Sequence, residues 1–164
     1  METRYWIGLL MAVLGICGIA VVANASDFYA PLEGSLVVPP SGSSGTGYAH
    51  FSVKATFDSV AYMISYSGLG SNATSLDIHI GVPFTNGPVG LHIGTGGGTS
   101  NSLTGTLAWP AVLRPYAETH TCQDGTYLEV DTESDPAGEL RGPLVCIPVS
   151  SKPSTWGALH RVYR

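Results

Sequence analysis

Residues 127–142, YLEVDTESDPAGELRG, decide the fold that the sequence predicts. Side chains alternate between the two faces of a strand, so in YLEVDT we expect Leu128 and Val130 on one face and Glu129 and Asp131 on the other. The first pair is apolar and the second pair is acidic. This alternation predicts a strand with one face toward a core.

The turn that follows is Asp135-Pro136-Ala137-Gly138. Aspartate caps such a turn, proline presets its φ angle, and glycine takes the conformation that other residues avoid. The segment from Glu139 then returns antiparallel. The stretch therefore predicts a β-hairpin.

Glu139 and Arg141 are two residues apart on the returning strand, so they share one face. Asp131 and Glu129 on the first strand are their candidate partners. The simplest interpretation is an exposed ion pair, which contributes about 0 to 1 kcal/mol. The functional alternative is that Arg141 orients Asp131. The acidic run departs from the EF-hand pattern, which favours a solvated acidic hairpin over a calcium loop.

The cysteines suggest how this hairpin is closed. Cys17 lies in an N-terminal apolar run that a secretory leader would remove, which leaves Cys122 and Cys146 as a pair. Thiols oxidise in exported proteins. Counting outward from the turn brings Cys122 and Cys146 close to opposite one another. We therefore expect a disulfide at the open end of the hairpin, contributing about 3 kcal/mol in the chain-entropy model.

The N-terminal 25 residues predict export. An uncharged apolar run from residue 6 to residue 22 is followed by Ala23-Asn24-Ala25, which predicts signal-peptide cleavage after Ala25. The alternative is that the apolar run is retained as a helical anchor in a membrane or a filament core. Residues 26–150 would then form one domain and residues 151–164 a mildly basic tail.

The composition predicts an all-β domain. The chain has 164 residues, with 21 glycines, 11 prolines and only 12% charged residues, which is typical of short strands joined by tight turns. The ranges 48–57 and 60–66 predict one hairpin, and strands recur about every ten residues, which favours an antiparallel Ig-like or Greek-key β-sandwich. The net charge of -5 argues against a nucleic-acid partner.

Several motifs together resemble one known family, the chordin-type extracellular (CHRD) domain. They are ISYSGLG at 64–70, LDIH at 76–79, NGPV at 86–89 and the GTYLEVDT and DPAGELRG segments within 125–142, and the resemblance spans about residues 34–145. It implies a secreted β-sandwich without an established catalytic role.

The same resemblance implies a candidate metal set. The family usually carries His-x-His where this chain has Asp77-Ile78-His79, and another histidine where this chain has Asp131. Two carboxylates and one imidazole suit zinc, manganese or calcium better than copper. The alternative is a polar cluster in which a carboxylate holds His79. A superoxide-dismutase-like redox module is disfavoured, because the five histidines are not spaced to surround copper.

These observations predict a protein that works by contact and not by turnover. The sequence contains no G-x-S-x-G elbow, no free cysteine and no paired-carboxylate cleft, so we expect no enzyme and no cofactor beyond a possible divalent metal. We expect a secreted or cell-surface structural or adhesive protein, including a self-associating filament subunit. Its partners would be itself or other extracellular proteins, with a membrane only if residues 6–22 are retained. Asn72-Ala73-Thr74 is a glycosylation sequon.

Overall fold

The computed structural model describes residues 24–82, 84–118 and 125–147. The prediction of an antiparallel β fold is confirmed: the paired strands are antiparallel throughout, and the single α-helix of the described residues is short. The strands are β1 (Asn24–Glu33), β2 (Thr46–Lys54), β3 (Ser59–Ser67), β4 (Ala73–Ile80), β5 (Val89–Gly94), β6 (Asn101–Ala108), β7 (Thr126–Thr132), β8 (Leu140–Pro143) and β9 (Val145–Ile147). The helices are the 3-10 turns η1 (Gly34–Leu36) and η2 (Ala111–Leu113), and α1 (Arg114–Glu118).

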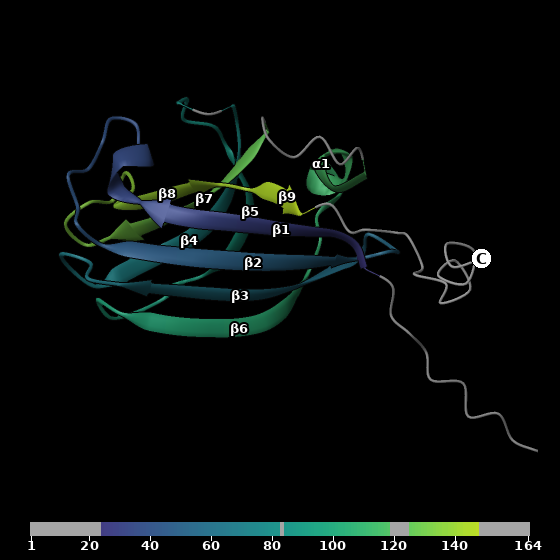
Figure 1. Cartoon of the computed structure of the whole chain (residues 1–164), viewed down its shortest axis with the longest axis horizontal. Helices are drawn as coiled ribbons and strands as arrows, with labels where there is room; N and C mark the ends of the chain where they lie inside the picture. Colours follow the sequence, from purple (N-terminus) through teal and green to yellow (C-terminus); the bar gives the residue numbers. More distant parts are fainter. Residues whose placement is uncertain (1–23, 83, 119–124, 148–164) are drawn as a thin grey trace, which may run out of the picture.

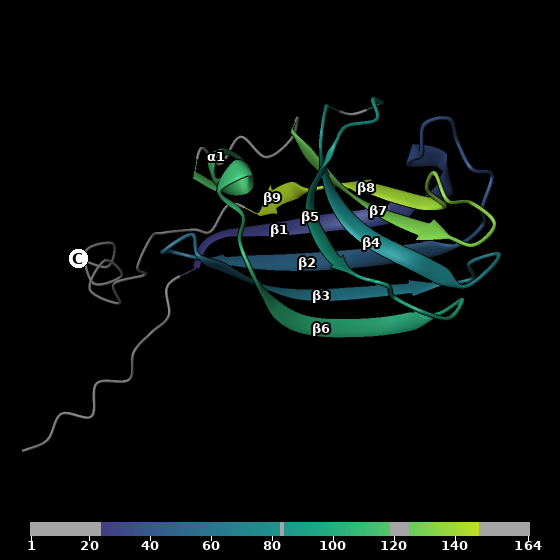
Figure 2. The same cartoon turned by 180° about the vertical axis from the view of Figure 1, so that it is seen from behind.

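The strands form one sheet that curls until it is nearly closed. Its order is β5-β4-β7-β8-β1-β2-β3-β6, and β9 pairs with β1 in line with β8. In Figure 1, β1, β2, β3 and β6 form the front layer and β4, β5 and β7 the layer behind it; Figure 2 shows the second layer in front. An Ig-like sandwich of two separate sheets is therefore not confirmed. The physical reason is that β1 pairs with β2 on one side and with β8 and β9 on the other, which joins the two layers.

Strand β1 is the element that the sequence did not predict. Its alternation is regular, because Phe28, Ala30 and Leu32 are buried. Pro31 obscures it, since proline lacks the N–H that a central strand needs. In the structure, Pro31 lies between the residues that pair with β9 and Glu33, which pairs with β8, so the missing donor falls at a gap in that ladder.

The core lies between the two layers. Residues from β1, β2 and β3 meet residues from β4, β7 and β8, and the largest fully buried side chains include Phe28, Phe51, Leu32, Ile64, Leu76, Ile78, Leu128 and Leu140. Burying each such side chain contributes about 1.5–3 kcal/mol. On β3 the alternation is regular, because Val60, Ile64 and Tyr66 face the core and are buried.

The hairpin at 127–142 has β7 and β8 as its two arms. Glu129 pairs with Arg141 and Val130 with Leu140, antiparallel. The turn is held by hydrogen bonds from the N–H of Gly138 to the Asp135 carbonyl (3.1 Å) and from the N–H of Glu139 to the Val130 carbonyl (2.8 Å). Gly138 has a φ of 109°, a value that residues with a Cβ rarely adopt.

Several predictions fall partly or wholly outside the described residues. Cys146 lies in β9 and is half-buried against the core, but Cys122 lies outside the described residues, so the disulfide stays a prediction. The apolar segment 6–22 and the tail 151–164 also lie outside them. In the ranges that the structure does describe, no helix has the length and apolar character needed to cross a membrane. Asn72 is exposed between β3 and β4, and its glycosylation stays a prediction.

Candidate functional site

The polar residues of the predicted site lie on the outer face of β4, β7 and β8. The register places Asp77 opposite Glu129, while Asp131 is opposite Ser75. His79 is opposite Tyr127. The predicted set Asp77, His79 and Asp131 therefore shares a face but is spread along two strands.

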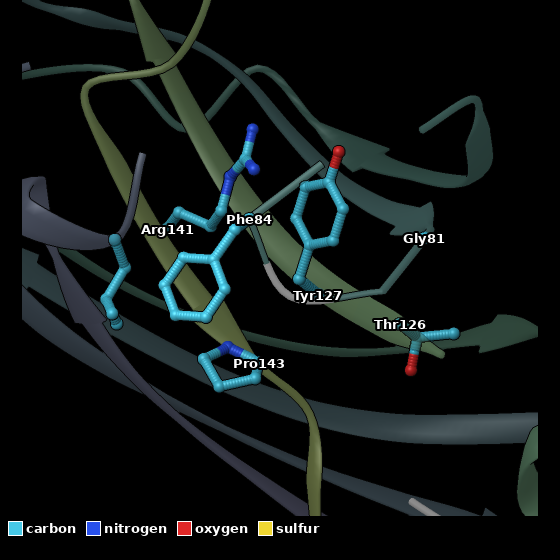
Figure 3. Close-up of a pocket in the computed structure, with 7 residues that line it drawn as sticks. Gly81, Phe84, Thr126, Tyr127, Arg141 and Pro143 are labelled. Carbon is cyan, nitrogen blue, oxygen red and sulfur yellow. The ribbon is translucent and has the colours of Figure 1, made fainter. Parts of the chain in front are cut away.

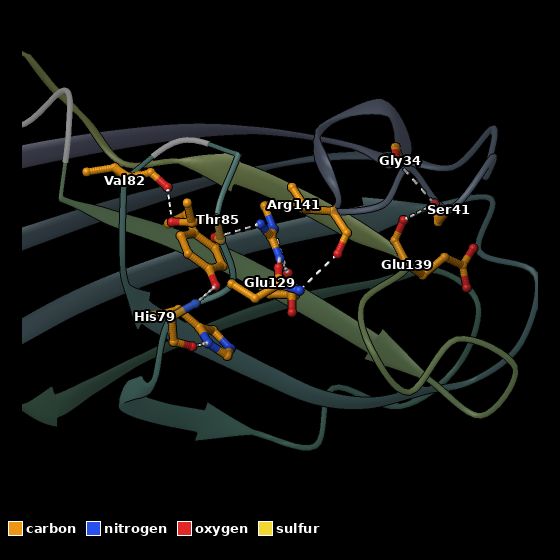
Figure 4. Close-up of polar contacts among 12 residues, drawn as sticks. Gly34, Ser41, His79, Val82, Thr85, Glu129, Glu139 and Arg141 are labelled. Atoms are coloured by element: carbon orange, nitrogen blue, oxygen red, sulfur yellow. Dashed lines mark hydrogen bonds and ion pairs between the residues drawn. The ribbon is translucent and has the colours of Figure 1, made fainter.

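Arg141 forms a buried ion pair with Glu129. Its Nε donates to Glu129 Oε2 at 2.6 Å, and its second terminal nitrogen lies 2.5 Å from the same oxygen. Figure 4 shows the two side chains pointing toward one another. Arg141 is 3% exposed and Glu129 is 6% exposed. The prediction of an exposed ion pair on a solvated hairpin is therefore wrong, and the partner of Arg141 is Glu129.

The burial comes from residues 81–82 and 84–88, between β4 and β5, which fold over this face. Arg141 donates to the Thr85 carbonyl at 3.2 Å and to Asn86 Oδ1 at 2.6 Å. The N–H of Gly87 donates to the Tyr127 hydroxyl at 2.9 Å. These bonds hold the loop against β7 and β8, so both faces of β7 are covered.

Tyr127 is the centre of a stack formed by three strands. The Arg141 guanidinium lies 4.2 Å from the centroid of the Tyr127 ring. The His79 ring stacks on Tyr127 with a centroid distance of 5.0 Å and an interplanar angle of 8°. His79 Nδ1 is 2.8 Å from the Gly87 carbonyl, so this nitrogen carries the proton and donates it. The tyrosine thus couples β4, β8 and the covering loop.

Phe84 and Tyr127 help to line a small apolar cavity beside this stack. Its volume is about 90 Å³, below the roughly 300–1,000 Å³ of ordinary small-molecule sites. Figure 3 shows Phe84, Tyr127, Arg141 and Pro143 around it. Phe84 is 76% exposed. The cavity is therefore smaller than an ordinary small-molecule site.

Asp131 is a half-buried carboxyl with like charges beside it. Burial, followed by the charges of Glu129 and Asp77, raises the pKa of Asp131 to about 6, while His79 and Arg141 partly oppose the rise. Among the described residues, no hydrogen-bond partner reaches Asp131 Oδ1, which is buried. His79 Nε2 is also buried without one.

The predicted metal set is not assembled as one cluster. In the described part of the chain, no group of three His, Cys, Asp or Glu side chains could hold a metal ion. Asp77 instead lies 2.7 Å from His92 Nδ1 and accepts a hydrogen bond from Ser75 at 2.5 Å. His92 was not predicted, because it reaches Asp77 only through the pairing of β4 with β5.

Glu139 has a separate role from the ion pair. Its carboxylate accepts hydrogen bonds from Ser43 Oγ (2.7 Å), the Gly70 N–H (2.7 Å) and Thr132 Oγ1 (2.8 Å), and the side chain is 1% exposed. Burial opposes its charge, but these bonds outweigh burial and lower the pKa of Glu139. Glu139 thus joins two loops to the hairpin.

We expect Asp131→Asn to stabilise the protein by about 1 kcal/mol above pH 6. Folding raises the pKa of Asp131 from 3.8 to about 6, so the folded protein binds this proton more tightly than the unfolded chain. The resulting cost is absent below the lower pKa, grows between the two values and is complete above the higher one. Two pKa units correspond to about 3 kcal/mol, which solvent screening of this half-buried carboxyl reduces.

Urea unfolding of both proteins at about pH 4 and about pH 7 measures this effect, since the stability difference between Asp131→Asn and the unaltered protein should be larger at pH 7. An equal difference between the two proteins at both pH values would contradict the raised pKa.

Comparison with protein families matches the model of the CHRD domain to residues 28–144. The chain belongs to the CHRD domain family. The resemblance seen in the sequence is thereby confirmed, and the match begins within β1, which the motifs had not included. CHRD domains occur in extracellular proteins, and the CHRD domain is not a known enzyme family. No solved structure matches the chain.

Proposed function

We propose that this CHRD domain is a non-catalytic, extracellular structural protein that associates with itself through strand β6. The polar face of β4, β7 and β8 supports a non-catalytic role. Its buried charges, Arg141 and Glu129, bind one another, and Arg141 also binds the loop that covers the sheet. Association requires a different surface. The observation that carries the proposal is the condition of the sheet edge at β6.

Strand β6 is a regular edge without the usual protection. Among the described residues it pairs only with β3, through all eight positions and without a register shift. Its sequence, NSLTGTLA, contains no charge and no proline. Exposed edges of this kind pair readily with other strands, and proteins normally block them with charges, proline or bulges. An unblocked edge therefore supports association by strand pairing.

The other edge of the sheet, β5, is protected. Its pairing with β4 is interrupted by two register shifts, between Leu76 and Asp77 and between Ile78 and His79. Such irregularities twist an edge away from regular pairing. The two edges therefore differ, and only β6 offers a continuous template.

The outer face beside β6 also suits contact with another protein. Tyr29, Tyr48 and Met63 are 42%, 38% and 39% exposed on β1, β2 and β3. The two tyrosine rings stack with centroids 6.2 Å apart. Tyrosine and methionine are enriched at protein interfaces. An adhesive role for this face is part of the proposal.

The alternative, a divalent-metal module using Asp77, His79 and Asp131, has weaker support. The unpartnered His79 Nε2 and Asp131 Oδ1 favour it. The register of β4 and β7 opposes it, because the three residues do not meet at one point.

The double variant Thr104→Lys/Thr106→Lys tests self-association. Both threonines are exposed on β6, so lysines there should leave the fold intact and block edge pairing. We expect the unaltered protein, purified as it is exported, to form oligomers whose fraction rises with concentration. The variant should sediment as a monomer under the same conditions in analytical ultracentrifugation.

The matched control is Ala61→Lys/Ser67→Lys, which places the same charge at exposed positions of the interior strand β3. We expect this control to associate like the unaltered protein. An unaltered protein that is monomeric at every concentration would overturn the proposal. So would a control that associates as weakly as the β6 variant, because the added charge would then act regardless of its strand.

A further inference from the structure

We propose that the partner of β6 is β6 of a second copy, paired antiparallel about a twofold axis at Gly105. This inference rests on the proposed function and specifies its contact. Figures 1 and 2 both show β6 along the margin of the layer, with β3 on one side only. The order of residues along that margin favours this pairing.

The centre of β6 reads the same in both directions. Residues 103–107 are Leu-Thr-Gly-Thr-Leu, and small residues, Ser102 and Ala108, flank them. A twofold axis through Gly105 places residue 104 opposite residue 106 of the second copy and residue 103 opposite residue 107. The contact is then isologous, because residue 104 meets residue 106 of the second copy and residue 106 meets its residue 104. The palindrome adds that each residue meets one of its own kind.

The two faces of β6 carry side chains that suit these pairs. Thr104 and Thr106 point outward and are exposed, and cross-strand threonine pairs stabilise antiparallel strands. Leu103 and Leu107 point inward and are half-buried against the core. Pairing would cover the leucine edges and extend the apolar layer across the axis.

Gly105 suits the position on the axis, where a residue meets itself. A Cβ added at Gly105 would lie 2.6 Å from the Tyr62 hydroxyl oxygen, so the tyrosine ring occupies the space that a side chain would need. With no side chain at this position, the two backbones can approach without a clash between identical groups. The half-buried Tyr62 rings would flank the axis on the inner face.

The arrangement predicts a closed dimer. The β1, β2, β3 and β6 strands of two copies would form one continuous layer, with the exposed tyrosines of both copies on the same outer face. A twofold contact uses the β6 edge of each copy, so no β6 edge is left for a third copy. A filament would need a second contact, for which the apolar segment 6–22 is the candidate from the sequence.

The contact is small. One strand per copy buries less than the roughly 1,200 Å² of a standard interface, so we expect a reversible dimer with a Kd in the micromolar range. The equilibrium is therefore sensitive to a single pair of charges, and the register can be tested by the sign of those charges.

The test is the charge pattern of residues 104 and 106. In the proposed register, Thr104→Lys/Thr106→Glu places lysine opposite glutamate in both symmetry-related pairs, whereas Thr104→Lys/Thr106→Lys places lysine opposite lysine. We expect the Lys/Lys variant to raise the dimer Kd about ten-fold or more. The Lys/Glu variant should return within about three-fold of the unaltered Kd, in analytical ultracentrifugation of the exported protein.

The controls separate the two proposals. Thr104→Glu/Thr106→Glu should be as weak as the Lys/Lys variant, and an equal mixture of these two variants should form heterodimers. Because all substitutions are exposed, thermal unfolding should change little and shows that each monomer is folded.

One result would overturn the Gly105 register and leave self-association standing: the unaltered protein forms a dimer, but the Lys/Glu variant dimerises as weakly as the Lys/Lys variant. An unaltered protein that remains monomeric would overturn both proposals.

Discussion

Arg141→Ala is expected to lower the free energy of unfolding by about 3–5 kcal/mol. The substitution leaves Glu129, which is 6% exposed, as a buried charge without its partner. It also removes the donors to Thr85 and Asn86 and the cation that lies over Tyr127. Urea unfolding of both proteins at the same pH measures the loss.

The double variant Arg141→Met/Glu129→Met is the control for this effect. Replacing both charges with apolar residues of similar length removes the desolvation cost together with the attraction, so most of the stability should return. Arg141→Lys keeps the charge but lacks the planar guanidinium that reaches Glu129 and Asn86 together. Its free energy of unfolding should lie between those of the unaltered protein and Arg141→Ala. A loss below about 1 kcal/mol for Arg141→Ala would contradict the buried ion pair.

Glu139→Ala is the second large effect, with an expected loss of about 3 kcal/mol. Glu139 is 1% exposed and accepts three hydrogen bonds, two of them from Ser43 and Gly70 in loops distant in sequence. Removing the carboxylate leaves these buried donors without an acceptor, at about 1–3 kcal/mol for each donor that water does not reach. Chemical unfolding measures the loss.

The pH dependence distinguishes a lost charge from lost packing. The pKa of Glu139 is lowered on folding, so its contribution is complete above the ordinary value of 4.5 and is lost as the pH falls through the folded pKa. The difference between the unaltered protein and Glu139→Gln should therefore shrink in acid. The exposed Glu133, on the same hairpin, is the matched control, and Glu133→Ala should change stability by less than about 0.5 kcal/mol. A difference for Glu139→Gln that does not vary with pH would contradict the lowered pKa.

The local part of the hairpin could be predicted from the sequence. Alternation placed Leu128 and Val130 on the inner face, and both are fully buried. The turn residues from Asp135 to Gly138 predicted where the chain reverses, because their φ preferences are local properties. The sequence named Asp131 and Glu129 as candidate partners of Arg141, and the structure pairs Arg141 with Glu129.

The environment of these residues could not be predicted in the same way. Alternation predicts which side chains share a face, but not whether another segment covers that face. Residues 84–88 cover the outer face of β7. Thr85 and Asn86 of this segment contact Arg141, which is more than fifty positions away in the chain. The expected solvated hairpin is buried for this reason. The joining of two layers into one sheet by β1 is likewise a long-range choice of partners.

The sequence by itself determined the antiparallel β character, the hairpin turn, the inward face of strand β7 and the CHRD family, because these depend on residue order and backbone preference over short distances. The tertiary structure alone decided that Glu129, Glu139 and Arg141 are buried, that Asp77 meets His92, and that β6 pairs with β3 alone among the described strands. These properties depend on which distant segments lie against each strand, and that is set by the free energy of packing the whole chain.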